Sequence, residues 1–216
     1  MISLTSKAQS SLGFEAGVSS NFLKINVTDR ASTAIEPKVG YYAGIKYQYH
    51  LYRWLYINTV PGIIQKKYSI ARTDSLSGIF EKKTNIYFQL PIMAHAVFGK
   101  KTQYFLEAGF YTSYWASGFV QGKIPAIFSI NTDKNQSQTF ELSSYQEKHT
   151  FNSMIDNRIE LGGVGGIGFQ YLVLKSYKIY IFSRYFQSMT DQEKKYMINH
   201  IPRYNQTLSF SLGLQF

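Results

Sequence analysis

"TLSFSLGLQF" (207–216), the last ten residues of the sequence, alternates strictly between polar and apolar side chains. Every second residue is apolar, which gathers five large side chains on one face: Leu208, Phe210, Leu212, Leu214 and Phe216. The opposite face carries small or polar residues: Thr207, Ser209, Ser211, Gly213 and Gln215. A period of two residues predicts a β-strand with one apolar face and one small, polar face.

The same alternation recurs along the sequence. Eight stretches show it: 11–23, 38–50, 53–68, 84–98, 103–118, 157–173, 176–188 and 204–216. Most of these exceed the ~5–6 residues that are typical of strands in soluble domains. The connections after the second, fourth and sixth stretches are short, whereas the other four are long and polar, at 24–37, 69–83, 119–156 and 189–203. This arrangement predicts an all-β fold, an eight-stranded antiparallel up-and-down barrel with long loops at one end and short turns at the other.

An eight-stranded barrel can have its apolar face inside, as in a soluble lipocalin-like ligand-binding barrel, or outside, as in a membrane barrel. No apolar run approaches the ~20 residues of a membrane-spanning helix, but a transmembrane strand needs only ~10 residues with alternate ones apolar. The polar faces combine glycine and serine with isolated charges, whereas Lys, Glu and Asp would crowd the solvent face of a soluble barrel. The pattern therefore favours a transmembrane β-barrel with a filled lumen, and the soluble barrel is the alternative.

Six charged residues fall on the polar faces and are expected in the lumen: Glu15, Lys46, Glu107, Arg158, Glu160 and Arg184. Turning Arg184 toward lipid would cost ~2–4 kcal/mol near the bilayer midplane. A charge in a narrow lumen must be paired or solvated. We therefore expect a structural ion-pair network, with Lys46 near Glu15 and Glu107 close to the short-turn end. A gated proton or ion path is the alternative.

Aromatic residues of the apolar faces fall near the two ends of the strands. Five are expected at the short-turn rim: Tyr47, Tyr49, Phe98, Tyr104 and Tyr171. Five more are expected toward the loop rim: Phe22, Tyr41, Tyr114, Tyr185 and Tyr204. Two such aromatic girdles are typical of membrane barrels. Phe216, an aromatic residue at the end of the last strand, resembles the signal that the barrel-assembly machinery reads.

Residues that could carry chemistry are sparse. The absence of Cys argues against a disulfide scaffold, a thiolate metal site and a cysteine nucleophile. No two histidines or carboxylates stand at ligand spacing, so no metal and no cofactor are expected. His149 and His200 fall in loops at the same rim as Ser143, Ser144 and Asp191. This leaves a lipid-modifying deacylase or acyltransferase as an alternative to a non-enzymatic barrel.

The formal net charge of +10 is distributed over turns and loops. Lysines cluster at 81–83, 99–101, 133–135 and 193–195, not along a groove with interleaved aromatic residues. This distribution disfavours nucleic acid as a partner. Cations at the outer rim would instead suit phosphorylated lipopolysaccharide.

Three stretches are similar to the outer-membrane β-barrel family common in Bacteroidetes, the PorT-like group. They are "GFEAGVSSNF" (13–22), "NIYFQLPIMAHAVFG" (85–99) and "YFLEAGFYTSYW" (104–115). The third strand departs from the family pattern, because it reads "VPGIIQKKY" (60–68) where a Glu-Leu-Tyr core is more frequent. The resemblance implies an eight-stranded outer-membrane barrel. Its named member is associated with type IX secretion, other small barrels serve as accessory subunits, and no catalytic residues carry over.

These observations give one expected organisation. Residues 1–8 end in the small-x-small pattern of a signal-peptidase site and are expected to be the remnant of a signal peptide. Residues 9–216 are expected to form one barrel in the outer membrane of a Gram-negative bacterium, with both termini periplasmic. We expect a non-enzymatic structural or accessory subunit whose partners are the lipid bilayer and lipopolysaccharide, the barrel-assembly machinery, and other outer-membrane proteins.

Overall fold

The computed structural model describes residues 10–25, 33–73, 77–125, 142–174, 177–194 and 200–216. Ten antiparallel strands lie in these segments: β1 (Ser10–Ile25), β2 (Thr33–Tyr52), β3 (Leu55–Thr59), β4 (Gly62–Arg72), β5 (Phe80–Gly99), β6 (Thr102–Pro125), β7 (Leu142–Lys148), β8 (Ile159–Leu174), β9 (Tyr177–Ser188) and β10 (Arg203–Gln215). No helix long and apolar enough to cross a membrane occurs in the described part of the chain.

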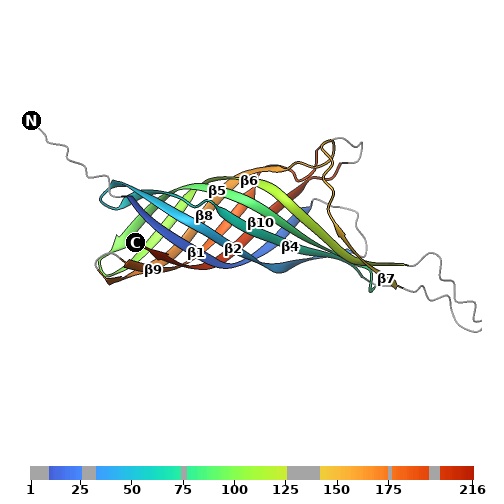
Figure 1. Ribbon diagram of the computed structural model, residues 1–216, viewed down its shortest axis with the longest axis horizontal. Coiled ribbons are helices and arrows are strands. Elements are labelled where there is room, and N and C mark those ends of the chain that lie inside the picture. Colours follow the sequence, from blue (N-terminus) through green and yellow to red (C-terminus); the bar gives the residue numbers. More distant parts are fainter. Residues whose placement is uncertain (1–9, 26–32, 74–76, 126–141, 175–176, 195–199) are drawn as a thin grey trace, which may run out of the picture.

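Neighbouring strands pair in sequence order and close on themselves (Figure 1). β1 pairs with both β2 and β10, which joins the first strand to the last from Gly13↔Gln215 to Ile25↔Arg203. β3 and β4 together fill one position between β2 and β5. β7 pairs with the end of β6 and stands outside the ring. The ring therefore has eight positions, and the prediction of an eight-stranded antiparallel up-and-down barrel is confirmed.

The predicted third strand is interrupted where Val60 and Pro61 separate β3 from β4. Proline has no amide hydrogen for a sheet ladder, and Val60 lies opposite a second proline, with its nitrogen donating to the carbonyl of Pro91 at 3.4 Å. The pairing with β2 nevertheless keeps the same register before and after the interruption. Tyr47 pairs with Thr59 of β3, and Gly44, three residues earlier, pairs with Gly62 of β4, three residues later. The interruption is local and does not change which side chains face inward.

Strands extend further at the loop end than expected. β6 continues to Pro125 and pairs with β7 from Phe119↔Lys148 to Pro125↔Leu142, inside the predicted 119–156 loop. This ribbon projects beyond the ring at the end opposite the C-terminus (Figure 1). The short turns are at the other end, where Gly99, the last residue of β5, takes a φ of 109°, a conformation that suits glycine.

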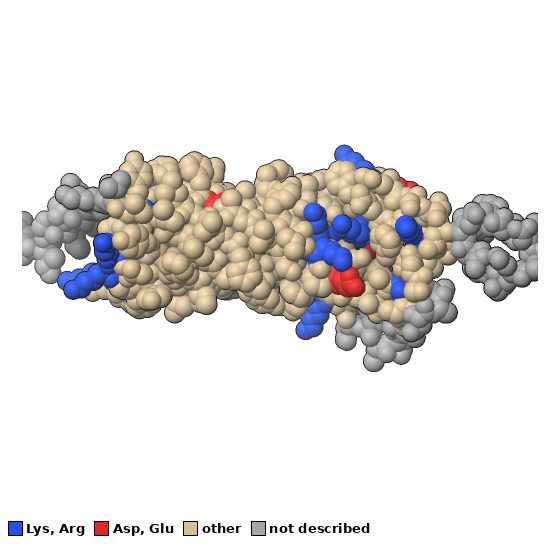
Figure 2. All heavy atoms as spheres, turned by 90° about the horizontal axis from the view of Figure 1, so that it is seen from below, with Lys and Arg blue, Asp and Glu red and all other residues tan. Residues whose placement is uncertain are grey.

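Apolar residues occupy both sides of the barrel wall. The inside holds an aromatic-rich cluster: Tyr42, Val60, Ile64, Tyr87, Met93, Phe105, Tyr111, Trp115, Val164, Tyr180, Phe182 and Phe186. The outside carries exposed residues such as Phe110 (72%) and Ile167 (61%). Figure 2 shows Lys and Arg gathered toward the two ends of one face, with an almost uncharged band between them. A closed barrel with such a band is built to lie in a bilayer.

Candidate functional site

A buried arginine connects three strands across the lumen near the short-turn end. Arg184 of β9 is fully buried, and its Nε donates to Oε2 of Glu107 on β6 at 2.6 Å. Its guanidinium also forms an ion pair with Glu15 of β1, and Nη2 lies 3.3 Å from Oε2 of Glu15. One cation thus faces two carboxylates that come from opposite parts of the ring.

Other side chains contact the remaining positions on these two carboxylates. Oε1 of Glu107 accepts from Nδ2 of Asn58 at 2.9 Å and lies 2.8 Å from Nδ1 of His95. Oε1 of Glu15 accepts from the hydroxyl of Tyr42 at 2.5 Å. Because each carboxylate has several hydrogen-bond partners on different strands, the network fixes the positions of both carboxylates.

Lys46 lies in the same tier but is not bonded to either carboxylate. Its Nζ is buried, has no hydrogen-bond partner among the described residues, and lies 4.3 Å from the ring centroid of Tyr180. Arg184 occupies the place beside Glu15 and Glu107 that was expected for Lys46, and Lys46 makes a cation–π contact instead. The two cations still balance the two carboxylates of the tier.

A second charged tier lies toward the loop end. Lys66 of β4 forms a buried ion pair with Glu160 of β8. Glu160 also accepts from the hydroxyl of Tyr111 at 2.7 Å and from Nδ2 of Asn205 at 2.6 Å. Sequence reasoning missed Lys66, because three polar residues in succession at 65–67 hide the two-residue period. The apolar neighbours at 64 and 68, both buried, were the available signal.

Arg158 does not lie in the lumen network, which corrects the expectation for it. It precedes β8, which begins at Ile159, so the strand period does not apply to its side chain. Its Nε donates to the carbonyl of Trp115 at 3.1 Å, and its guanidinium carbon lies 4.0 Å from the ring centroid of Phe151 and 4.5 Å from that of Tyr114. Arg158 therefore stabilises the loop rim through aromatic packing.

Two segments at the loop end of the barrel pair with each other. Asp156 and Glu193 form a β-bridge, and the nitrogen of Asn157 donates to the carbonyl of Gln192 at 3.0 Å. The side chain of Gln192 reaches inward and donates to the hydroxyl of Tyr87 at 3.0 Å. These contacts join the two segments to each other and to Tyr87 in the lumen.

The loop histidines pair with aspartates and not with serines. His149 Nε2 lies 3.2 Å from Oδ2 of Asp156, and His200 Nε2 lies 2.5 Å from Oδ2 of Asp191. The two candidate serines lie in β7, and Ser144 is five residues of extended chain, roughly 16 Å, from His149. No described hydrogen bond joins a serine to either histidine. Among the described residues, no group of three or more His, Asp or Glu could hold a metal ion.

The aromatic residues expected at the two rims lie on the outer face. Nine of them are exposed: Phe22, Tyr41, Tyr47, Tyr49, Phe98, Tyr104, Tyr114, Tyr171 and Tyr185. Tyr204 is only partly exposed. Phe216 is 46% exposed and exchanges backbone hydrogen bonds with Leu12. The ring centroids of Phe216 and Phe14 are 5.9 Å apart. Its part in assembly stays a prediction.

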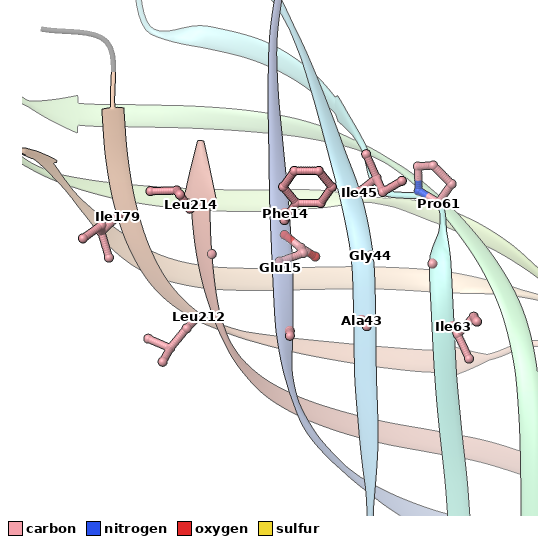
Figure 3. Close-up of a pocket in the computed structure, with 13 residues that line it drawn as sticks. Phe14, Glu15, Ala43, Gly44, Ile45, Pro61, Ile63, Ile179, Leu212 and Leu214 are labelled. Atoms are coloured by element: carbon pink, nitrogen blue, oxygen red, sulfur yellow. The ribbon is translucent and has the colours of Figure 1, made fainter. Parts of the chain in front are cut away.

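A shallow hollow in the outer wall lies across β9, β10, β1, β2 and β4 and has a volume of about 790 Å³ (Figure 3). Two small residues, Ala16 and Ala43, pair with each other at its centre. They are flanked along the ladder by Leu212 on β10 and Ile63 on β4. The neighbouring row of larger side chains includes Phe14. The hollow therefore arises because the side chains at this point of the apolar outer surface are smaller than those around them.

A closed antiparallel ring with an apolar outer band, exposed rim aromatics and a charge-balanced lumen defines an outer-membrane β-barrel. The chain belongs to the family described as outer membrane protein beta-barrel domain, whose model matches residues 6–192. The protein is thus an outer-membrane protein. No curated protein matches its sequence.

The chain is similar to solved outer-membrane proteins at low sequence identity, and with a TM-score above 0.5 to the first of the following three. The outer membrane protease OmpT from Escherichia coli is 9% identical, with a TM-score of 0.57 and coverage of 100% of this chain and 98% of that chain. OprG from Pseudomonas aeruginosa is 9% identical, with a TM-score of 0.49 and 97% coverage of both chains. OmpW from E. coli is 11% identical, with a TM-score of 0.48 and coverage of 97% of this chain and 100% of that chain.

Proposed function

We propose that this protein is a non-enzymatic structural or accessory subunit of the outer membrane, which acts through its wall and its loop end. The observation that carries the proposal is the filled lumen. Two tiers of buried charge, around Arg184 and around the Lys66–Glu160 pair, cross the lumen together with large aromatic side chains. A continuous path for solutes would require these pairs to separate, which would leave buried charges without a partner and is therefore unfavourable.

The hollow around Ala16 and Ala43 supports a contact with a second outer-membrane protein. Small residues on a membrane-facing surface let another backbone approach closely, and packing is the main attraction between protein segments in lipid. A partner side chain would fill a volume that is otherwise left to lipid tails. The short turns and the C-terminus lie at one end, which supports a periplasmic position for the termini and an external position for the long loops.

Within the family, we propose a place in the PorT-like group, on the basis of the three stretches at 13–22, 85–99 and 104–115. A role beside a secretion, transport or biogenesis machine follows from that resemblance. The outer wall is the surface that such a role would use.

The test is to fill the hollow and follow what co-purifies from native outer membranes in mild detergent. Ala43→Phe should abolish co-purification of the partner without changing the heat-modifiable migration of the barrel. Ala94→Phe is the matched control, because Ala94 pairs with Ala108 on a different part of the outer wall. Equal retention of the partner by both variants would refute the wall contact. Stable large conductance in planar bilayers would refute the filled lumen.

A further inference from the structure

Five aromatic side chains form a continuous row on the outer wall at the short-turn end, and we call this row the aromatic shelf: Trp54, Phe98, Tyr104, Phe169 and Tyr171. Each of them is between 41% and 66% exposed. The rings of Trp54 and Phe98 stack, with their centroids 6.3 Å apart. Phe98 pairs directly with Tyr104 across β5 and β6, and Tyr104 pairs directly with Phe169 across β6 and β8. Directly paired residues point to the same face of a sheet, so the rings form one surface.

Two lysines stand at the edge of the aromatic shelf. Lys100 and Lys101 lie in the turn between β5 and β6, two and three residues after Phe98. The Nζ of Lys101 lies 5.6 Å from the ring centroid of Tyr171, so its ammonium is placed on the outer side of the wall. The carbonyl of Lys101 also accepts from the nitrogen of Leu172 at 3.3 Å, which holds the turn against β8. The cations therefore border the aromatic surface.

The short-turn end contains no acidic side chain that could neutralise these lysines. The sequence of its three turns with their flanking strand ends, 47–57, 95–104 and 170–180, contains five Lys or Arg and no Asp or Glu. The loop end differs, because there Lys38 pairs with Glu36, Lys83 with Glu81 and Arg203 with Glu193. A counter-charge for the short-turn rim has to come from outside these stretches.

The position of the aromatic shelf selects the kind of anion. The rings lie at the edge of the apolar outer band, where aromatic side chains of membrane barrels meet lipid headgroups. A zwitterionic headgroup brings an ammonium of its own, which the lysines repel, whereas an anionic headgroup carries an uncompensated phosphate. An acidic soluble protein could neutralise the lysines, but it would not cover aromatic rings on the lipid side of the wall. The surface therefore fits an anionic phospholipid.

We propose that the aromatic shelf and the turn with Lys100 and Lys101 bind an anionic phospholipid in the leaflet at the short-turn end. The headgroup phosphate lies at the two ammonium groups, and the glycerol and the first carbons of the acyl chains pack on the rings of Phe98, Tyr104 and Tyr171. The assignment of this leaflet to the periplasmic side rests on the orientation proposed above, but the choice of lipid does not.

Trp54 provides a natural reporter for the site. The chain contains two tryptophans, and the other, Trp115, is only 6% exposed and lies in the cluster inside the barrel. In bilayers of phosphatidylcholine brominated near the headgroup end of its acyl chains, lipid beside the aromatic shelf quenches the fluorescence of Trp54. Unlabelled phosphatidylglycerol should relieve this quenching about fivefold more effectively than unlabelled phosphatidylcholine at low salt, the effect of one lysine beside an anionic lipid. Trp54→Phe should remove the signal.

A pair of double variants tests the role of the lysines. Lys100→Gln/Lys101→Gln should abolish the preference, so that the two unlabelled lipids compete equally. The control Lys82→Gln/Lys123→Gln removes the same charge from the same two strands at the loop end and should keep the preference. Heat-modifiable migration verifies that each variant is folded. In the unmodified protein, high salt should weaken the preference, since screening acts on exposed charges.

Three results would overturn the proposal. The first is equal competition by phosphatidylglycerol and phosphatidylcholine in the unmodified protein. The second is an equal loss of preference in the control variant, which would show that the total charge of the protein decides. The third is tight binding of soluble polyglutamate that depends on Lys100 and Lys101 and occurs without any preference among lipids, which would assign this end to an acidic protein.

Discussion

Replacing Arg184 by methionine should destabilise the barrel strongly, because it leaves two buried carboxylates without their shared cation. Glu15 and Glu107 are both buried, and Arg184 contacts each of them with two nitrogens. Removal of one partner from a buried ion pair costs ~3–5 kcal/mol. We expect a decrease of that size in the free energy of unfolding, measured by urea titration of the barrel in detergent micelles.

A second variant separates charge imbalance from loss of packing. Arg184→Met/Glu15→Gln removes one positive and one negative charge, so that Lys46 and Glu107 remain and the tier is neutral again. This double variant should be more stable than Arg184→Met alone, although it changes more side chains. The control Arg53→Met, at an exposed position in a short turn, should leave the urea midpoint unchanged. The charge-balance argument would be refuted if the double variant lost as much free energy of unfolding as Arg184→Met and Glu15→Gln lose when their separate effects are added.

Three further outcomes are expected. Gly213→Ala should lower the free energy of unfolding by ~1–3 kcal/mol, because the added Cβ would overlap the Tyr180 ring. The control Gly163→Ala should fold normally, since its Cβ would have only Met189 nearby, at 3.6 Å. Equal urea midpoints of the two variants would contradict this prediction. Deleting Phe216 should slow insertion in vivo, measured by pulse-chase, more than it shifts the urea midpoint of the folded barrel, and unchanged insertion would exclude an assembly role. His149→Ala and His200→Ala should leave the lipid A composition unchanged by mass spectrometry, and an altered acyl pattern would favour the enzyme.

Most of the fold could be predicted from the alternation of side chains, because the two faces of each strand meet different surroundings. The period identified all eight positions of the ring, including the interrupted one around Pro61. It failed for β7, whose residues are nearly all exposed on both faces, so that no period arises. The sequence signal for a strand exists only where one face is apolar and the other is not.

The lumen residues could be predicted as a set, but their partners could not. Strand period placed Glu15, Glu107 and Arg184 inside, yet Arg184 is 169 positions from Glu15 and 77 from Glu107. Which of the inward cations meets a carboxylate depends on the tilt and stagger of the strands, and this geometry is absent from any single strand. The prediction that Arg158 lies in the lumen failed for a related reason. The direction of its side chain depends on where β8 begins, and β8 begins one residue later, at Ile159.

The small polar face of the last strand allows the lumen network to form. Glu15 of β1 and Arg184 of β9 lie on strands that are separated by β10, and the β10 residues beside them are Gly213 and Ser209. Tyr180 of β9 covers Gly213 so closely that a Cβ would overlap its ring, and its hydroxyl lies 3.3 Å from Oε2 of Glu15. Larger residues on β10 would block both side chains. Because Arg184 meets Glu15 across β10, we expect this ion pair, unlike the Arg184–Glu107 and Lys66–Glu160 pairs, to form only after β1 has joined β10.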